Sequence, residues 1–169
     1  MQLFDKKFRW FALGLACGVV GMFCFPRPNL KAMAASQSPK FAMCTTPAQL
    51  GNPEAVFVVD FVTGRLIGGA FNTQSGGFTQ SYSRDLAADF NVAEDAQYVM
   101  VPGEMQTLGA GVARGGAAGG SPATGGIYIG ELTSGLVILY GFRYTNSNRQ
   151  VPDQSLVKLA QFPWRQALK

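Results

Sequence analysis

Short stretches of alternating apolar and polar residues run along this chain, and two of the most apolar stretches resemble each other. Ala55–Phe71 reads AVFVVDFVTGRLIGGAF, and Gly126–Phe142 reads GIYIGELTSGLVILYGF. Both are rich in β-branched and aromatic residues, are too short for stable helices and contain a small residue followed by glycine. Glycine at positions 64 and 135 supplies the positive φ that a tight turn between strands requires. Each stretch is therefore predicted to form a β-hairpin.

The likeness extends beyond the hairpins and defines two units of similar sequence. Upstream of the hairpins, for example, Phe41–Cys44 parallels Tyr98–Val101. The units are residues 41–90 and residues 98–162, and together they form a domain that covers residues 41–169. A repeat of this kind predicts that the two halves share one arrangement of strands.

Each unit is predicted to fold as a four-stranded antiparallel meander, with one strand before the hairpin and one after it. The first strands read FAMCT and YVMVP, and the last strands read GFTQSYSR and SLVKLAQF. The match between the units ends with Leu86–Phe90, which resembles Leu159–Phe162. Residues 84–94 fit a short helix equally well, because their apolar side chains fall at helical spacing. The expected fold class is all-β, behind one N-terminal hydrophobic helix.

The relation between the two meanders is open. Repeats of about 40–50 residues with four strands are typical of β-propeller blades, but a closed propeller needs about four blades and this chain offers two. The two meanders can face each other as a sandwich, join in one continuous twisted sheet, or be pooled between several chains in a ring. For a single chain we favour the sandwich, because it buries both apolar faces.

The first 25 residues are predicted to direct the chain to a membrane. Trp10–Phe25 is a run of 16 residues without charge that follows a basic start. A spanning helix uses about 20 apolar residues and a signal-peptide core about 7–15, so the run fits a retained anchor or a cleaved signal peptide. Cleavage would follow Ala34, within a segment rich in Pro, Ala and Ser at 26–40 that is predicted to be a linker. The basic residues before the run favour an extracytoplasmic body.

Glycine dominates residues 103–126, where it occupies nine positions. This segment is predicted to be a loop inserted in the second unit, because such a composition buries too little apolar surface to offset the entropy of ordering the chain. The GK[ST] sequence of a phosphate-binding loop is absent.

The distribution of charge argues against nucleic-acid binding. The net charge of the 169 residues is +4, but the whole excess lies in residues 1–34. Residues 35–169 contain nine basic and nine acidic side chains, so the body is neutral and lacks the basic surface that nucleic acid requires.

The residue inventory excludes several kinds of chemistry. The sequence has no histidine, which removes a serine–histidine–aspartate arrangement and the commonest metal ligand. Cys44 is the one cysteine beyond residue 34, so a zinc–thiolate site and an internal disulfide are excluded there. We interpret Cys44 as a buried thiol, with an intermolecular bridge as the alternative. No metal, cofactor or catalytic residue is assigned.

Two carboxylates occupy equivalent places in the repeats. Asp60 precedes the first hairpin turn and Glu131 precedes the second. A pair of carboxylates held about 5–10 Å apart can hydrolyse glycosidic bonds, which makes this pair the candidate catalytic group if the chain is an enzyme. The interpretation that we favour is that each carboxylate accepts hydrogen bonds from its own turn.

Two further groups of side chains are candidates for binding. The acidic group lacks the regular oxygen spacing of a calcium loop and is predicted to be a solvated surface; it consists of Asp85, Asp89, Glu94 and Asp95. The aromatic group fits either a sugar- or peptide-stacking platform or a core; it consists of Phe78, Tyr82, Tyr140, Phe142, Tyr144 and Trp164. Trp164, near the C-terminus, is the candidate for an exposed contact.

Both hairpins, together with YVMVPGE ahead of the second, resemble those of uncharacterised membrane-anchored or secreted proteins typical of planctomycete bacteria. The resemblance covers most of residues 41–162 and implies pairs of hairpins behind a hydrophobic N-terminus. The second hairpin is also similar to blades of the YVTN-type β-propellers. Neither resemblance implies an activity or a catalytic residue.

These features predict a non-catalytic β-module at the cell envelope, tethered through residues 10–25, that serves protein interaction or assembly. Its partner would be an envelope protein or a second copy of the chain; the GxxxG spacing at Gly14–Gly18 and the thiol of Cys44 both favour self-association. Two alternatives stay open. One is a glycan hydrolase that uses Asp60 and Glu131, and the other is a glycan-binding protein secreted after cleavage behind Ala34.

Overall fold

The computed structural model describes residues 35–49, 54–92, 96–105 and 120–165. The chain divides into two compact units, Met1–Ala32 and Met33–Lys169, and all described residues belong to the second. The predicted N-terminal hydrophobic helix, its GxxxG spacing and most of the predicted linker therefore lie outside the described residues. Within the described ranges, no helix has the length and apolar character needed to span a membrane.

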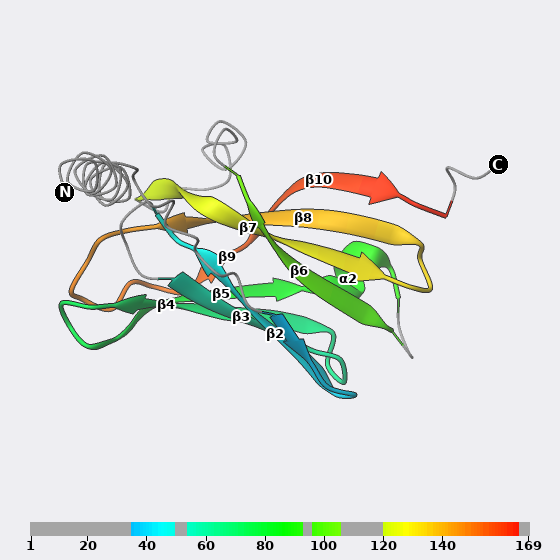
Figure 1. Cartoon of the computed structure of the whole chain (residues 1–169), viewed down its shortest axis with the longest axis horizontal. Coiled ribbons are helices and arrows are strands. Elements are labelled where there is room, and N and C mark those ends of the chain that lie inside the picture. Colours follow the sequence, from blue (N-terminus) through cyan, green and yellow to red (C-terminus); the bar gives the residue numbers. More distant parts are fainter. Residues whose placement is uncertain (1–34, 50–53, 93–95, 106–119, 166–169) are drawn as a thin grey trace, which may run out of the picture. The chain divides into compact units, whose positions relative to one another are not determined.

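The first of two β-sheets has six strands in the order β1-β2-β3-β4-β5-β9 (Figure 1). All neighbours in it are antiparallel except β5 and β9, which are parallel. Its strands are β1 (Ala35–Gln37), β2 (Phe41–Pro47), β3 (Glu54–Asp60), β4 (Arg65–Asn72), β5 (Gly77–Asp85) and β9 (Gln154–Ser155).

The second sheet has four antiparallel strands in the order β10-β8-β7-β6. Its strands are β6 (Tyr98–Glu104), β7 (Ser121–Glu131), β8 (Leu136–Tyr144) and β10 (Val157–Pro163). One short helix, α2 (Leu86–Phe90), follows β5. The prediction of a mostly β protein is thus confirmed, and each predicted hairpin is present: β3 pairs with β4 and β7 pairs with β8.

Glycine shapes both hairpin turns as the sequence predicts. Gly64 and Gly135 each have φ of +65°. The Gly64 NH donates to the carbonyl of Asp60 at 2.9 Å, and the Gly135 NH donates to the carbonyl of Glu131 at 3.2 Å. Because an L-residue with a side chain rarely adopts this φ, the two turns depend on glycine.

The ends of the two predicted units differ from one another. Leu86–Phe90 forms α2, whereas Leu159–Phe162 lies in β10, so the predicted match between them is wrong. The helix begins because the Asp85 side chain caps it, accepting a hydrogen bond from the Ala88 NH at 3.1 Å. The described part of this segment, residues 84–92, therefore contains both predicted forms, with strand up to Asp85 and helix from Leu86 to Phe90.

Strands extend into two segments that were predicted to lack structure. Ala35–Gln37 of the predicted linker forms β1, which pairs with β2. In the predicted glycine-rich loop, β6 continues to Glu104 and β7 begins at Ser121, with Gly103 opposite Gly126. Pairing between neighbouring strands satisfies the backbone groups at these positions, and this outweighs the low strand propensity of glycine. The middle of that loop lies outside the described residues.

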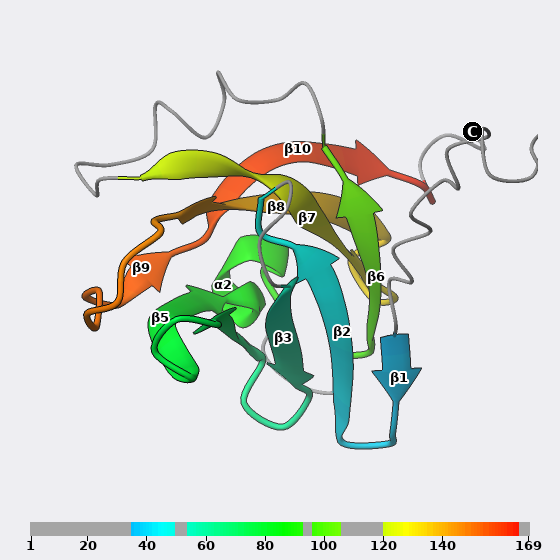
Figure 2. The same ribbon diagram turned by 60° about the vertical axis from the view of Figure 1, so that its left-hand side comes forward.

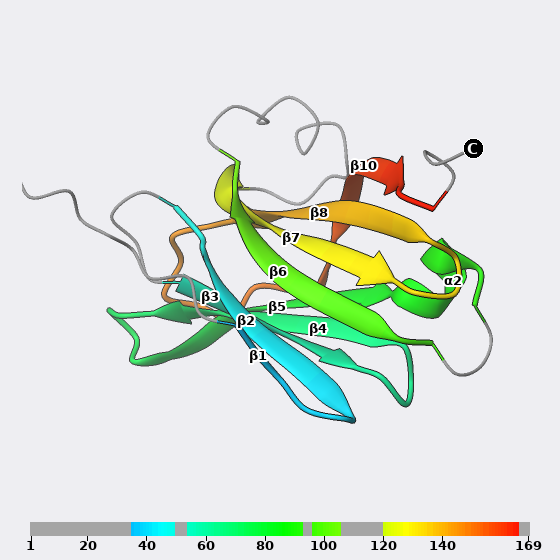
Figure 3. The same cartoon turned by 45° about the vertical axis from the view of Figure 1, so that its right-hand side comes forward.

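One core lies between the two sheets. Figure 3 shows the strands of the second sheet lying over those of the first. The ring of Phe57 from β3 packs against that of Phe142 from β8, with centroids 5.0 Å apart, and Tyr82 from β5 packs on the same Phe142 at 5.1 Å. Leu66 and Ile129, from opposite sheets, are fully buried. The sheets therefore stabilise each other by burying their inner faces.

The two sheets are also joined at both sides. On one side β2 lies beside β6 (Figure 2), and the hydroxyl of Thr46 donates to the carbonyls of Gly103 and Gly126, each at 3.4 Å. On the other side the chain leaves the first sheet after β9 and enters the second at β10. Leu156, the one residue between these strands, is fully buried.

Candidate functional site

The two candidate catalytic carboxylates are each occupied by their own turn. Asp60 accepts hydrogen bonds from the Val62 NH at 2.9 Å and from the Thr63 hydroxyl at 2.7 Å. Glu131 accepts from the Thr133 NH at 2.8 Å and from the Ser134 NH at 2.5 Å. The interpretation favoured from the sequence is confirmed, since both carboxylates stabilise turns.

Hydrogen bonding keeps both carboxylates ionised. The Thr63 hydroxyl and the Val62 NH lower the pKa of Asp60. Burial raises the pKa of Glu131, but the NH groups that point at its oxygens outweigh burial and hold the pKa below the ordinary value. A general acid for glycoside hydrolysis needs the opposite shift. Asp60 also does not line the pocket of about 430 Å³ that Glu131 lines together with Tyr128 and Trp164.

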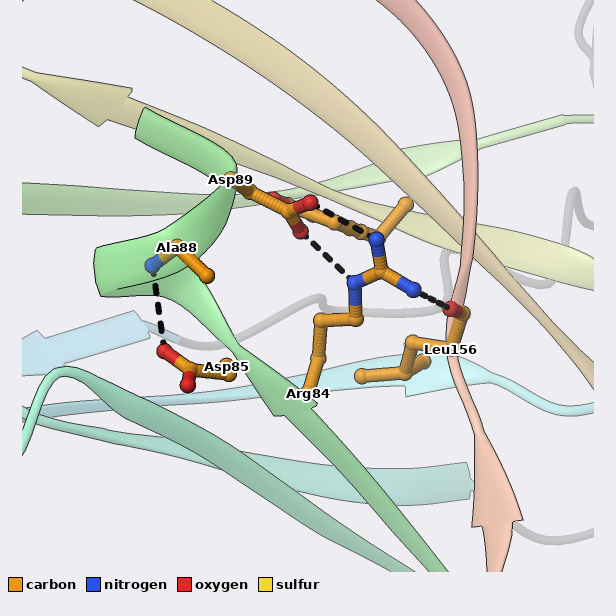
Figure 4. Close-up of polar contacts among 6 residues, drawn as sticks. Arg84, Asp85, Ala88, Asp89 and Leu156 are labelled. Atoms are coloured by element: carbon orange, nitrogen blue, oxygen red, sulfur yellow. Dashed lines mark hydrogen bonds and ion pairs between the residues drawn. The ribbon is translucent and has the colours of Figure 1, made fainter. Parts of the chain in front are cut away.

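The acidic group resolves into a helix cap and an ion pair. Asp85 caps α2, while Asp89 forms two hydrogen bonds with the guanidinium of Arg84, from Nε at 2.6 Å and from Nη2 at 2.7 Å (Figure 4). The Tyr140 hydroxyl donates to the same carboxylate at 2.8 Å, and Arg84 Nη1 donates to the Leu156 carbonyl at 3.3 Å. The cluster therefore ties α2 to both sheets.

The two remaining members of the acidic group, Glu94 and Asp95, lie outside the described residues. Within the described ranges, no three acidic or cysteine side chains gather as metal ligands would. The prediction of a solvated acidic surface holds for Asp85, which is exposed, and is wrong for Asp89, whose side chain is 13% exposed. Arg84 explains the difference, because its charge and hydrogen bonds compensate for the desolvation of the carboxylate.

A polar pocket of about 620 Å³ lies beside this ion pair. Several of its charged groups are already engaged: Arg84 pairs with Asp89, and the hydroxyl of Ser83 donates to Asp153 at 2.8 Å. Burial raises the pKa of Asp89, but the hydrogen bonds from Arg84 and Tyr140 outweigh it and lower the pKa below the ordinary value. The pocket therefore contains a stabilised ion pair, and the pKa of Asp89 is not raised as that of a general acid would be.

Cys44 is buried, as expected from its place in an apolar strand, and is 1% exposed. Burial raises its pKa to about 12. The thiolate, which is the reactive form, is therefore scarce at neutral pH, and the sulfur is inaccessible to a second chain in the folded body. This argues against the alternative of an intermolecular disulfide.

The aromatic group divides between the core and the surface. Its buried members are Tyr82, Tyr140, Phe142 and Tyr144, which are all 3% exposed or less. Phe78 and Trp164 are 58% and 36% exposed. An aromatic platform built from all six residues is thus wrong, while the prediction of an exposed Trp164 is confirmed.

The most distinctive surface is the outer face of the second sheet. Two rows of paired residues cross its four strands there, and none of the eight is charged. The first row is Val99, Gly130, Val137 and Phe162, and the second is Val101, Tyr128, Leu139 and Ala160. We call these eight residues the apolar face; Leu139 is buried, with 6% exposed, and the other seven are at least partly exposed.

The outer face of the first sheet has one largely charged row, and its next two rows mix apolar residues with hydroxyl groups: Met43, Val58, Ile67 and Ser83, then Thr45, Val56, Gly69 and Ser81. In the charged row, Phe41 pairs with Asp60, Asp60 pairs with Arg65, and Arg65 pairs with Asp85. An antiparallel sheet with one solvated face normally carries such polar residues on it. The apolar face of the second sheet departs from this rule, since the hydroxyl of Tyr128 is the one polar side-chain group among its eight residues.

The apolar face contains a groove of about 430 Å³. Gly130 forms its floor, because the strand neighbours of this glycine bear side chains and it bears none. Apolar side chains surround this floor, namely Val99, Val101, Tyr128, Leu132, Val137 and Trp164. The amide side chains of Gln37 and Gln97 supply polar groups at the lining.

The strand edges of the body are poorly suited to pairing with another chain. β1 and β9, the edge strands of the first sheet, have three and two residues. β10 contains Lys158, Pro163 and a register shift between Lys158 and Ala160. β6 lies beside β2, and its Tyr98 carbonyl accepts a hydrogen bond from Gln37 at 3.4 Å. Short, bulged or charged edges discourage strand addition, so side chains on a face offer the better binding surface.

The groove was not predicted from the sequence, apart from Trp164. The sequence does contain a feature that indicates this surface. A strand with one solvated face normally alternates apolar and polar residues, but the runs YVMVP, IYIGEL and LVILYGF are apolar at both odd and even positions. A comparison of the chain with protein-family models, curated proteins and solved structures finds no match.

Proposed function

We propose that this protein is a non-catalytic interaction module that binds a polypeptide through the apolar face of its second sheet. One observation carries the proposal: eight paired positions of the sheet lack any charge, seven of them are at least partly exposed, and five of them line an apolar groove. Contacts at such a face require no catalytic or ionisable side chains from the protein. They require a partner whose apolar side chains fill the groove.

The exposure of this face supports a partner on energetic grounds. Val99, Val101 and Phe162 are each more than half exposed. Removing apolar surface from water contributes roughly 25 cal/mol per Å², and exposed apolar patches of several hundred Å² are typical of binding sites. Tyr128 and Trp164 border the groove, and such residues often contribute most of the binding energy at interfaces.

The rival function, glycan hydrolysis by Asp60 and Glu131, has less support. Both carboxylates accept hydrogen bonds from neighbouring backbone NH groups, and they lie on strands of different sheets. Glycan binding has one favourable observation, which is that Tyr128 and Trp164 line the same groove. A sugar site also needs several polar groups around the ring, and the side chains around Gly130 are mostly apolar.

Our proposal places the body outside the cytoplasm, tethered to the membrane through residues 10–25. The uncharged run at Trp10–Phe25 and the basic residues before it support this placement. We also infer that the body is a two-sheet sandwich that arose by duplication of a blade-like unit. The equivalent hairpins, with glycine at positions 64 and 135, support this origin.

Site-specific photocrosslinking in cells that make the full chain tests the proposal. A photoreactive residue replaces Val101 on the apolar face or, as a matched control, Ile67 on the outer face of the first sheet; these side chains are 52% and 53% exposed. A polypeptide adduct from position 101 and none from position 67 is expected. No adduct from position 101, or equal adducts from both positions, would refute the proposal. Crosslinks to saccharide alone would favour glycan binding.

A further inference from the structure

We propose that the polypeptide bound by the apolar face is a second copy of this chain, with Phe162 of each copy inserted above Gly130 of the other. This inference rests on the proposed function, because it assumes that the apolar face is an interaction surface. It adds the identity of the partner and the geometry of the contact.

The register of the second sheet makes this face self-complementary. Val137 on β8 pairs with Gly130 on one side and with Phe162 on the other. Neighbouring strands lie about 4.8 Å apart, so Gly130 and Phe162 lie at about equal distances on either side of Val137. A two-fold axis that passes beside Val137, parallel to the strands, therefore brings the Phe162 of one copy over the Gly130 of the other. A two-fold interface of this kind joins the same patch on both copies.

None of the residues that the structure describes requires glycine at position 130. A Cβ atom at this position would make ordinary contact with Val137 Cγ2 at 3.6 Å, and the backbone of Gly130 does not adopt a positive φ. Glycine within a strand lowers stability, and it often marks a place where another chain approaches closely. By contrast, a Cβ atom at Gly103 would clash with the ring of Tyr128, so that glycine is required by internal packing.

Phe162 supplies the matching protrusion. It is 57% exposed on β10, at the edge of the sheet, and it faces the same side as Gly130. Between the two copies no charge has to be desolvated over the eight positions of the apolar face. The nearby carboxylate of Glu131 is 1% exposed and accepts hydrogen bonds from its own turn. Contact between two such faces therefore avoids the main cost of burying polar groups.

The size of the face indicates a weak dimer. An axis beside β8 sets β7, β8 and β10 of one copy against β10, β8 and β7 of the other. Three strands about 4.8 Å apart, over about six residues each, present roughly 300 Å² per copy. A pair would bury roughly 600 Å², which is below the 1,200–2,000 Å² that is usual for stable complexes. We therefore expect a dissociation constant in the micromolar range or weaker. Tethering both copies to one membrane would raise their effective concentration and favour the dimer.

Two substitutions test the dimer in the purified full chain, in detergent micelles with reductant, by sedimentation equilibrium. Gly130→Val adds a side chain at the floor of the groove, where a Cβ atom makes only ordinary contact with Val137, and Phe162→Ala removes the protrusion. The matched control is Gly77→Val on β5 of the first sheet, where a Cβ atom meets nothing within 4 Å. We expect the first two variants to raise the dimer dissociation constant at least tenfold and the control to change it less than twofold. Near-UV circular dichroism verifies that each variant is folded.

The proposal is overturned if the wild-type chain is monomeric at all concentrations, or if neither Gly130→Val nor Phe162→Ala weakens its dimer. The second result would place self-association elsewhere in the chain. Photocrosslinking at Val101 separates these outcomes from failure of the proposed function. An adduct with twice the mass of the chain supports the dimer, an adduct of another mass supports the interaction module alone, and the absence of adducts contradicts both.

A symmetric crosslink provides an independent measurement. With Cys17 and Cys24 replaced by serine and Cys44 buried, Val137→Cys adds one accessible thiol, close to the proposed two-fold axis. Two packed sheets lie about 10 Å apart, which is within reach of a short bis-maleimide. We expect covalent dimers from Val137→Cys and few from Ile67→Cys. Equal yields from the two positions would contradict the two-fold arrangement.

Discussion

The guanidinium of Arg84 and the carboxylate of Asp89 form a two-pronged ion pair, with Nε–Oδ2 and Nη2–Oδ1 distances of 2.6 and 2.7 Å. Arg84 lies at the end of β5 in the first sheet, and Asp89 lies on α2. Tyr140, from the second sheet, donates its hydroxyl to Asp89. The pair therefore links elements of both sheets to the one helix of the described body.

Asp89→Asn should destabilise the body by about 2 kcal/mol, because it leaves Arg84 with its Nε and Nη2 groups poorly paired. The partial exposure of Arg84 keeps the value below that for a fully buried pair. Urea unfolding of the Met33–Lys169 unit measures the change. Asp85→Ala, which removes the helix cap, should cost only about 1 kcal/mol. If Asp89→Asn costs no more than Asp85→Ala, the ion pair is not a principal link.

Acid should unfold this body progressively as its hydrogen-bonded carboxylates take up protons. The pKa values of Asp89 and Glu131 lie below their ordinary values of 3.8 and 4.5. Their contribution to stability is therefore complete above about pH 5, and it is lost as the pH falls through the lowered pKa values. Urea midpoints measured from pH 7 to pH 2 should decline below about pH 5. Glu131→Gln should reduce this decline, and an unchanged pH profile would show that Glu131 does not contribute.

Cys44 should be unreactive in the folded protein. Its burial and its pKa of about 12 leave little accessible thiolate at pH 8. In a chain with Cys17 and Cys24 replaced by serine, Ellman's reagent should label less than one tenth of Cys44 in native buffer during the time in which it labels all of it in urea. Labelling at the rate of a free thiol in native buffer would show that β2 opens readily.

The glycines at positions 64, 130 and 135 should respond oppositely to substitution. Gly64→Ala and Gly135→Ala each place a side chain at φ of +65° and should destabilise the protein by about 1–2 kcal/mol. Gly130→Val should leave the stability of the monomer unchanged or increase it, because the position has room and valine favours strands. Thermal unfolding of the three variants measures the difference. A large loss of stability in Gly130→Val would show that the glycine serves the fold itself.

Local sequence patterns predicted the hairpins well because the determinants of a hairpin are local. The second halves of the hairpins predicted at Ala55–Phe71 and Gly126–Phe142 form β4 and β8, and the turns fall at the predicted glycines. The switch of the chain between sheets at Leu156 could not be predicted. It depends on β9 pairing with β5 and β10 pairing with β8, and both are contacts with distant parts of the sequence.

Prediction of the site was limited by a related problem. Asp60 and Glu131 could be assigned to their turns, since each turn is a few residues long. The apolar face could not be assigned, because its strands have apolar residues at both odd and even positions. Such a sequence does not reveal which side of the strand faces the core. Gly130 in particular resembles any glycine of a strand until its neighbours Val99 and Val137 are known.

The accessibility of the apolar face in intact cells tests the central claim most directly. Val101→Cys and Ile67→Cys, in a full chain with Cys17 and Cys24 replaced by serine, present side chains of nearly equal exposure on opposite sheets. Maleimide labelling in cells, divided by labelling of the purified chain in urea, gives the protection of each position. We predict that position 101 is at least fivefold less labelled than position 67, because a polypeptide covers the apolar face. Equal labelling of the two positions would contradict the assignment of this face as the functional surface.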